Sequence, residues 1–207
     1  MDDFQEATVL QALGDNQWEI TLTKDWALWG PAGGYLAALA LRAAKDSTEF
    51  TRPVSLSCHF LRVAKFEAIQ LDVESLRRGK RSEVLRVNLV QDDKLILTAM
   101  VWVTDADQET MVHDYATVNN IPAPDSLKSY QEVYPNRSVH PFMRRMEHRP
   151  IDPVTDGDLT PREPENAGLY RFFPKPMADD YFIDACRATI LIDTFAWLAT
   201  YPAHPIA

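Results

Sequence analysis

The segment that most constrains the fold of this chain is residues 33–46, with the sequence GGYLAALALRAAKD. Every residue from Leu36 to Leu41 is apolar, and no charged side chain occurs before Arg42. A helix that is apolar on all sides has to be covered on all sides. The segment therefore predicts a central helix that other elements enclose, and this helix begins at a pair of glycines.

Segments of alternating apolar and polar residues predict the elements that enclose this helix. A hairpin is expected over 8–23, and four strands are expected over 54–60, 69–74, 85–89 and 95–104. The short turns between them favour an antiparallel meander over parallel strands with helical crossovers. The last strand is apolar on both faces, so Ile96, Met100 and Trp102 on its outer face are expected to be covered by another domain or another chain.

The remaining residues predict a second and smaller set of elements. Residues 105–165 contain eight of the fourteen prolines, which indicates a long connection with short helices near 125–133 and 139–148. A strand is expected over 168–173, followed by a second apolar helix from an N-cap at Asp179 or Asp180 to just before Pro202. These predictions divide the chain into residues 1–105, a Pro-rich connection over 106–165, and residues 166–207.

An antiparallel sheet wrapped around one long helix is the hot-dog arrangement, which belongs to the α+β class. Four segments resemble the N-terminal half of the thioesterase-like, TesB-type double hot-dog proteins: GPAGGYLAALALRAA, RPVSLSCHFLRVA, VESLRRGKRSEVLRVNLVQDD and ILTAMVWVTD. The segment DACRATILIDTFAWLA is similar to the central helix of their second hot-dog. The resemblance covers residues 20–105 well and residues 165–200 more loosely.

The resemblance implies hydrolysis of acyl-CoA thioesters at a site between the two hot-dogs. In such proteins an aspartate on the second central helix acts with a threonine and a glutamine from later strands to position water, and Asp193 matches that aspartate. A second hot-dog needs several strands after its helix, whereas this sequence ends at Ala207. We therefore expect one complete hot-dog and a partial second, whose remaining strands were truncated, are supplied by another subunit, or were lost.

The glycine pair, Gly33 and Gly34, is the first group of candidate catalytic residues. Backbone N–H groups at the positive end of a helix dipole can polarise a thioester carbonyl and hold the oxyanion that develops. The alternative is that the glycines only permit a tight turn from loop into helix.

Asp193 is the second catalytic candidate. Its helix neighbours are Thr189, Ile190, Ala196 and Trp197, which predicts a largely apolar surrounding. Burial of an unpaired carboxylate is costly and would raise its pKa toward the range that suits a general base. The alternative is an ordinary helix aspartate that accepts a hydrogen bond from a neighbouring unit.

Four residues are candidates for substrate binding. Trp29 and Tyr35 flank the glycines and could line an acyl pocket, although aromatic residues in such places more often belong to the core. Arg78 and Arg81 lie in the hairpin RRGKR and could contact the phosphates of coenzyme A, although most basic hairpins are simply solvated. A Ser–His nucleophile pair at His59 is disfavoured because no G-x-S-x-G motif is present.

Charge and composition exclude several other classes. The net charge of −9 argues against nucleic acid or an anionic membrane as a partner. No secretion signal or membrane span is apparent, and two cysteines indicate no disulfide framework, so we expect a cytoplasmic protein. The five histidines show no metal-ligand spacing, so neither a metal nor a cofactor is predicted.

Together these residues predict an acyl-CoA thioesterase that uses a water activated by Asp193 and an oxyanion site at Gly33 and Gly34. The alternative is a non-catalytic acyl or acyl-CoA binding module, or an assembly subunit, with the same fold. A dehydratase acting on acyl thioesters is ranked last, because no helix shows a His and acid pair. We also expect a homo-oligomer, a dimer formed through sheet faces, because the outer face of 95–103 needs cover.

Overall fold

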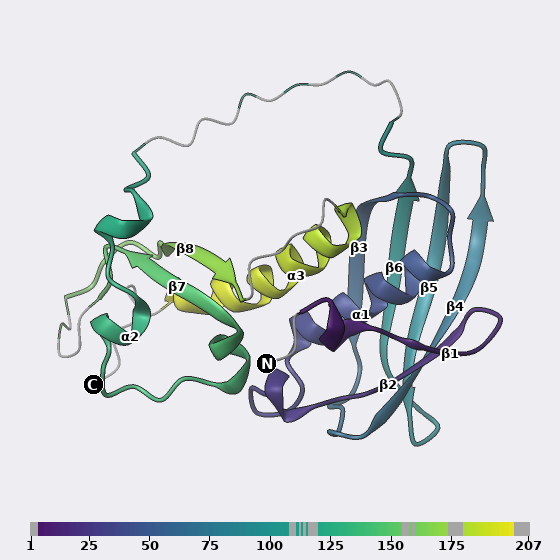
Figure 1. The fold of residues 1–207 in the computed structure, drawn as a ribbon, viewed down its shortest axis with the longest axis horizontal. Helices are drawn as coiled ribbons and strands as arrows, with labels where there is room; N and C mark the ends of the chain where they lie inside the picture. Colours follow the sequence, from purple (N-terminus) through teal and green to yellow (C-terminus); the bar gives the residue numbers. More distant parts are fainter. Residues whose placement is uncertain are drawn as a thin grey trace.

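The computed structural model describes residues 4–107, 111, 113, 115, 120–154, 158, 160–173 and 180–200, apart from the side chains of 195–198. Six antiparallel strands form the main sheet, in the order β1-β2-β4-β5-β6-β3 (Figure 1). Their bounds are β1 Gln11–Gly14, β2 Gln17–Thr21, β3 Arg52–Phe60, β4 Ala68–Arg78, β5 Ser82–Gln91 and β6 Lys94–Thr104. The predicted hairpin and the antiparallel arrangement are confirmed. The predicted four-strand meander is correct only for β4, β5 and β6, because β3 pairs with β6 and not with β4.

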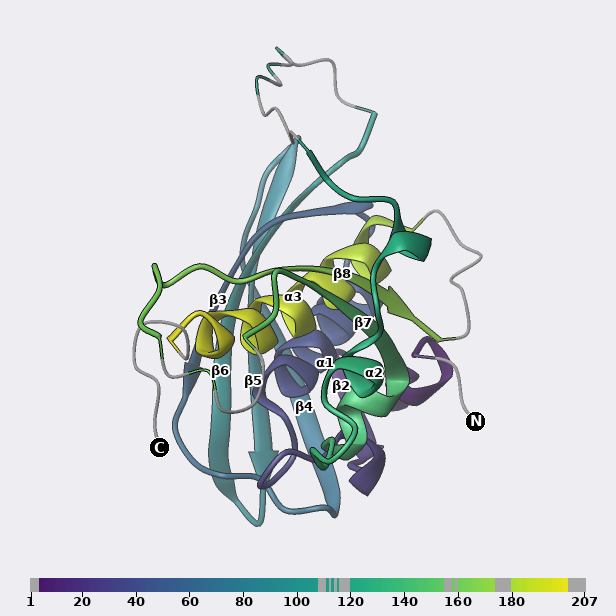
Figure 2. The same ribbon diagram turned by 90° about the vertical axis from the view of Figure 1, so that its left-hand side faces the viewer.

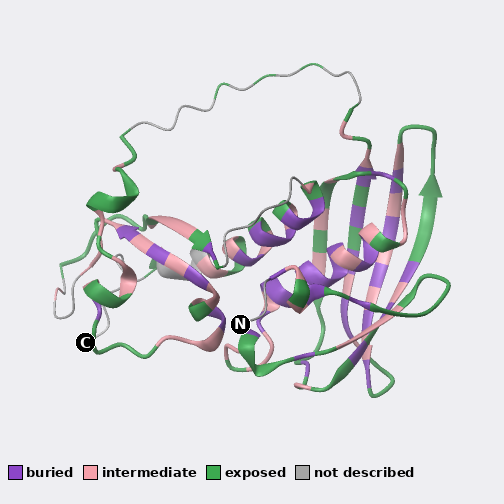
Figure 3. Cartoon of the chain, viewed as in Figure 1, coloured by how far each residue is buried: buried purple, intermediate pink, exposed green. Residues whose placement is uncertain are grey.

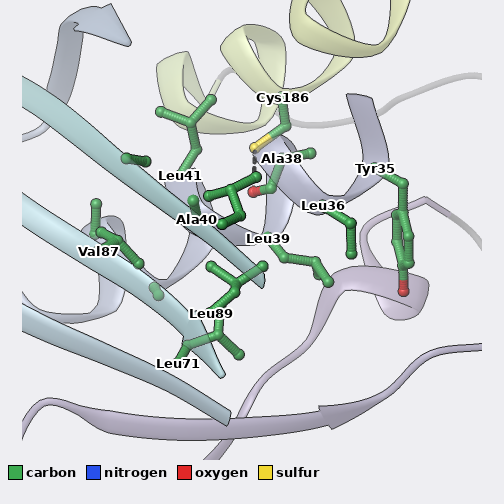
Figure 4. Close-up of a cluster of buried hydrophobic side chains, with 14 of the residues drawn as sticks. Tyr35, Leu36, Ala38, Leu39, Ala40, Leu41, Leu71, Val87, Leu89 and Cys186 are labelled. Carbon is green, nitrogen blue, oxygen red and sulfur yellow. Dashed lines mark hydrogen bonds between the residues drawn. The ribbon is translucent and has the colours of Figure 1, made fainter. Parts of the chain in front are cut away.

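Helix α1, Gly33–Asp46, lies in the hollow of this sheet and contacts β3, β4, β5 and β6. Its apolar residues are buried on every side (Figure 3). Leu39 has no exposed surface. Burial of one leucine side chain contributes about 1.5–3 kcal/mol. Figure 4 shows Leu39 pointing toward Leu71 and Leu89 of the sheet, whereas Ala38 faces another helix. The enclosed central helix, and with it the hot-dog fold, is confirmed.

The outer face of β6 is only partly as predicted. Met100 and Trp102 do lie on the outer face, where 37% and 49% of their surfaces are exposed. Ile96 was predicted beside them but is buried. The reason is a register shift in the β5–β6 ladder, between Leu89 and Val90, which places Ile96 and Leu97 consecutively in the interior.

The region after the main sheet contains short helical segments and a second small sheet. The 3-10 helix η3 (Pro124–Ser126) and α2 (Tyr130–Val133) agree with the helix expected near 125–133. The helix expected near 139–148 is correct only in part: the 3-10 helix η4 (Pro141–Arg145) lies in this range, but strand β7, Met146–Ile151, begins where the helix was expected to continue. Strand β7 pairs antiparallel with β8, Ala167–Phe172, and this pairing overrides the local pattern.

Helix α3, Tyr181–Leu198, runs antiparallel to α1 and also contacts β3 (Figures 1 and 2). The Cys186 thiol donates to the Ala38 carbonyl at 3.4 Å, midway along the pair. Asp180 caps α3, because its Oδ1 accepts the backbone N–H groups of Phe182 and Ile183. Among the described segments, no helix combines the length and hydropathy needed to cross a bilayer.

Candidate active site

The two helices bring a carboxylate to the N-terminus of α1. The backbone N–H of Gly34 donates to Asp193 Oδ2 at 2.8 Å, although the two residues are 159 positions apart in the sequence. The N-cap residue of α1, Ala32, has no side chain that could accept from the first turn. Asp193 therefore acts as a cap supplied by another helix, at the end where the helix dipole favours negative charge.

Gly34 makes this close approach possible because it lacks a side chain. A Cβ at Gly34 would lie 2.8 Å from the Ile190 Cα, 3.0 Å from the Asp193 Cβ and 3.2 Å from the Thr189 carbonyl oxygen. A Cβ at Gly33 would meet the Asp193 carboxylate and the Phe60 ring at 3.4 Å, an ordinary contact. The close contact of the glycine pair is thus with the backbone of α3, which the sequence alone did not reveal.

Asp193 is exposed, so the prediction that it is buried is wrong. Its helix neighbours Thr189 and Ile190 do pack toward α1, but Ile192 beside it is 72% exposed. No described element covers this side of α3. The carboxylate therefore has one oxygen bonded to the helix terminus and lies at the boundary with solvent.

Exposed apolar side chains lie on the segments that adjoin the N-terminus of α1. Phe60, at the end of β3, is 55% exposed and lies beside Gly33. Val63 is 83% exposed and packs near Gly30, and the neighbouring Trp29 is 84% exposed. Phe60 and Val63 were missed as site residues, although Phe60 occupies the inward phase of β3 at the strand end next to the glycines.

The predicted binding residue Trp29 is exposed on the loop before α1, where its ring centroid lies 6.3 Å from that of His140, whereas Tyr35 belongs to the core. Tyr35 is buried, its ring stacks on Trp26 at 5.1 Å, and its hydroxyl donates to the Ala7 carbonyl at 2.9 Å. Burial, reinforced by the nearby charge of Asp25, raises the pKa of Tyr35. The alternative of a core aromatic, left open from the sequence, describes Tyr35 correctly.

The basic hairpin lies far from the carboxylate. At one end of the sheet Ser82 pairs with Thr104, and at the other Phe60 pairs with Leu97. The nine residues of β3 separate these ends by about 26 Å. Arg78 forms an ion pair with Glu49 there, and Arg81 lies in the same hairpin, so the structure does not bring these arginines together with Asp193.

A polar groove of about 230 Å³ occupies this far end of the sheet. It is lined by Glu49, Phe50, Arg78, Gly79, Lys80 and Asp105. The guanidinium of Arg78 also lies over the Phe50 ring, 5.7 Å from its centroid. Within the described ranges, no group of three or more His, Cys, Asp or Glu side chains could hold a metal ion.

An enclosed helix and a curved antiparallel sheet together define a hot-dog fold, in which a second helix places a carboxylate at the N-terminus of the first. Residues 22–104 match the sequence model of the acyl-CoA thioesterase N-terminal domain. The resemblance to TesB-type thioesterases predicted from the sequence is therefore confirmed.

Solved structures have the same fold over nearly the whole chain. A conserved protein of unknown function with a hot-dog fold from Alicyclobacillus acidocaldarius matches 99% of this chain and 74% of its own, with a TM-score of 0.81 and 22% identity. The tesB protein of Mycobacterium avium subspecies paratuberculosis matches 89% of this chain and 66% of its own, with a TM-score of 0.71 and 22% identity. The acyl-CoA thioesterase II TesB2 of Mycobacterium marinum matches 92% of this chain and 68% of its own, with a TM-score of 0.68 and 22% identity. This chain therefore spans about two thirds to three quarters of their lengths.

Proposed function

We propose that this chain hydrolyses a thioester of coenzyme A at the N-terminus of α1. The observation that carries the proposal is the hydrogen bond from the Gly34 N–H to Asp193 Oδ2, which fixes a carboxylate beside a helix terminus. The match of residues 22–104 to an acyl-CoA thioesterase domain supports the same reaction class.

In this mechanism the second carboxylate oxygen, Oδ1, takes a proton from water as the water attacks the thioester carbonyl carbon. The carbonyl oxygen becomes an oxyanion near the positive end of α1. When the intermediate collapses, the C–S bond breaks and the protonated Asp193 returns its proton to the departing thiolate. Products are a carboxylic acid and free coenzyme A, and no cofactor is consumed.

The two glycines take different roles in this proposal. Gly34 positions the resting carboxylate, because its N–H is bonded to Asp193. The N–H of Gly33, the half-exposed first residue of α1, is the donor assigned to the oxyanion. The exposed side chains of Trp29 and Phe60 are assigned to the acyl group.

The test is release of free thiol from a panel of acyl-CoA substrates. Removing a general base typically costs 10²- to 10⁴-fold in rate, so we expect a loss of about that size in kcat for Asp193→Asn. Asp184→Asn is the matched control, because Asp184 is an exposed carboxylate of the same helix, paired with Arg187. Absence of turnover on every chain length would reject the proposal.

The exposure of Asp193 favours one alternative, a non-catalytic acyl or acyl-CoA binding module or assembly subunit. A base at a solvent boundary gains less from a dry site than a buried one does. This alternative predicts saturable acyl-CoA binding without thiol release, and the same affinity for wild type and Asp193→Asn. Equilibrium dialysis with a labelled acyl-CoA separates the two.

We further propose that the chain forms a homodimer through sheet faces, because Met100 and Trp102 expose apolar surface on the main sheet. Light scattering coupled to size exclusion tests this, and a monomer at high concentration would contradict it. A cytoplasmic location and a role in lipid metabolism are parts of the same proposal. The free thiols of Cys58 and Cys186 are consistent with a reducing compartment.

A further inference from the structure

A buried histidine lies in the β7–β8 sheet, away from the residues assigned above. His148 is 5% exposed and stacks between two tyrosine rings, with centroid distances of 4.2 Å to Tyr170 and 5.5 Å to Tyr130. Within the described part of the chain, neither of its ring nitrogens has a hydrogen-bond partner. A buried polar group without a hydrogen bond costs about 1–3 kcal/mol of stability, so a histidine at this position needs a physical explanation.

The histidine borders a small cavity that also reaches α3. The cavity measures about 10 Å³, close to the space of one water molecule. It is lined by Tyr130, Gln131, Val139, Met143, Met146, His148, Tyr170 and Thr194. Gly168 is also needed here, because a Cβ at that position would lie 2.8 Å from His148 Nε2.

Thr194 connects this cluster to the proposed site. It follows Asp193 directly on α3, and its hydroxyl donates to the Ile190 carbonyl at 2.8 Å. Ile190 is also the residue whose backbone lies closest to Gly34. The same turn of α3 therefore contacts Gly34 on one side and lines the cavity beside His148 on the other.

We infer that His148 is a positioning residue: in its neutral form it seats this turn of α3, and thereby holds the Asp193 carboxylate at the Gly34 amide. The inference deepens the proposed function by naming a control on the same site. It concerns the geometry of Asp193 and does not require that the site be catalytic.

The surroundings of the ring explain why only the neutral form fits. Among the described residues, the titratable groups beside it are the hydroxyls of Tyr130 and Tyr170, and the neutral Thr194 from α3 lines the same cavity. The adjacent carboxylate of Glu147 is engaged by Arg149 and Arg171. Burial lowers the pKa of His148 to about 4. Protonation would place a charge without a counter-ion in the cluster, which the cluster relieves by opening.

The test uses NMR-detected amide exchange at Gly34, in the full chain and without substrate. In wild type we expect a Gly34 protection factor that is nearly constant above pH 7 and falls at least tenfold as the pH drops from 6.5 to 4. His148→Phe keeps a stacked ring but cannot be protonated, so most of the fall should disappear in this variant.

Two further variants complete the experiment. His148→Ala should lower the Gly34 protection factor at least tenfold at pH 7, whereas His113→Phe, an exposed control of the same residue type, should leave it unchanged. If His148→Phe follows the wild-type pH profile, the inference is overturned. Should His148→Ala not fold, His148→Phe alone decides. Because exchange needs no turnover, this result stands apart from the thiol-release assay.

Discussion

Replacing Gly34 with alanine should push α3 away from α1 and destabilise the protein. The new Cβ would lie 2.8 Å from the Ile190 Cα, about 0.6 Å short of an ordinary contact at 3.4 Å. Overpacking of this kind costs about 1–3 kcal/mol. Loss of the hydrogen bond from the Gly34 N–H to the charged Asp193 carboxylate would cost up to about a further 3 kcal/mol. The higher helix propensity of alanine than of glycine offsets about 1 kcal/mol of this loss. We expect a net loss of about 2 kcal/mol.

The measurement is thermal and urea unfolding of Gly34→Ala beside Gly33→Ala. For a chain of this size, a loss of about 2 kcal/mol lowers Tm by about 4–8 °C. A Cβ at Gly33 meets nothing closer than 3.4 Å, so Gly33→Ala should be neutral or up to about 1 kcal/mol more stable. Equal stabilities of the two variants, or a Gly34→Ala as stable as wild type, would refute the helix-contact argument.

Three other outcomes are expected. The pKa of His148 is about 4 in the folded chain and 6.5 in the unfolded chain, so on acidification the unfolded chain binds the proton first. The free energy of unfolding should therefore fall by about 3 kcal/mol as the pH drops from 6.5 to 4. His148→Phe should remove this fall. Asp180→Ala, which loses a helix cap and an ion pair, should cost about 1–2 kcal/mol in urea unfolding, more than Lys45→Met, which loses only the ion pair. Burial raises the pKa of Cys58 to about 11 and of Cys186 to about 12, so neither should react with a disulfide reagent at pH 8 until denaturant is added.

Hydrophobic periodicity was sufficient to predict the main sheet and its helix. Helix α1 begins and ends where its apolar run predicted, because an all-apolar helix has few stable placements outside a core. Strand β7 was missed for a definite reason. Its buried positions are Met146, His148 and Pro150, of which only the first is a typical core residue, so no apolar alternation marked the segment as a strand.

The site was harder to predict because it depends on contacts between distant segments. Helix periodicity does place Tyr35 about 200° around α1 from Gly33, which directs it away from the glycine opening and into the core. The exposure of Asp193, in contrast, is decided by which elements cover α3, and local sequence neighbours do not contain that information. The bond to Gly34 likewise joins residues 159 positions apart.

A carboxylate and an oxyanion compete for the same helix terminus, and the order of proton transfer resolves this competition. When the oxyanion forms, Asp193 has just taken the proton of water and is neutral, so the two negative charges do not coexist. Asparagine imitates that neutral state. Asp193→Asn should therefore bind an anionic product, such as octanoate, more tightly than wild type does. Two unit charges about 4 Å apart repel by about 1 kcal/mol in a water-like medium, which suits an exposed carboxylate and corresponds to roughly fivefold in Kd. Calorimetric titration at neutral pH measures the difference, and equal affinities would show that the product carboxylate does not lie beside Asp193.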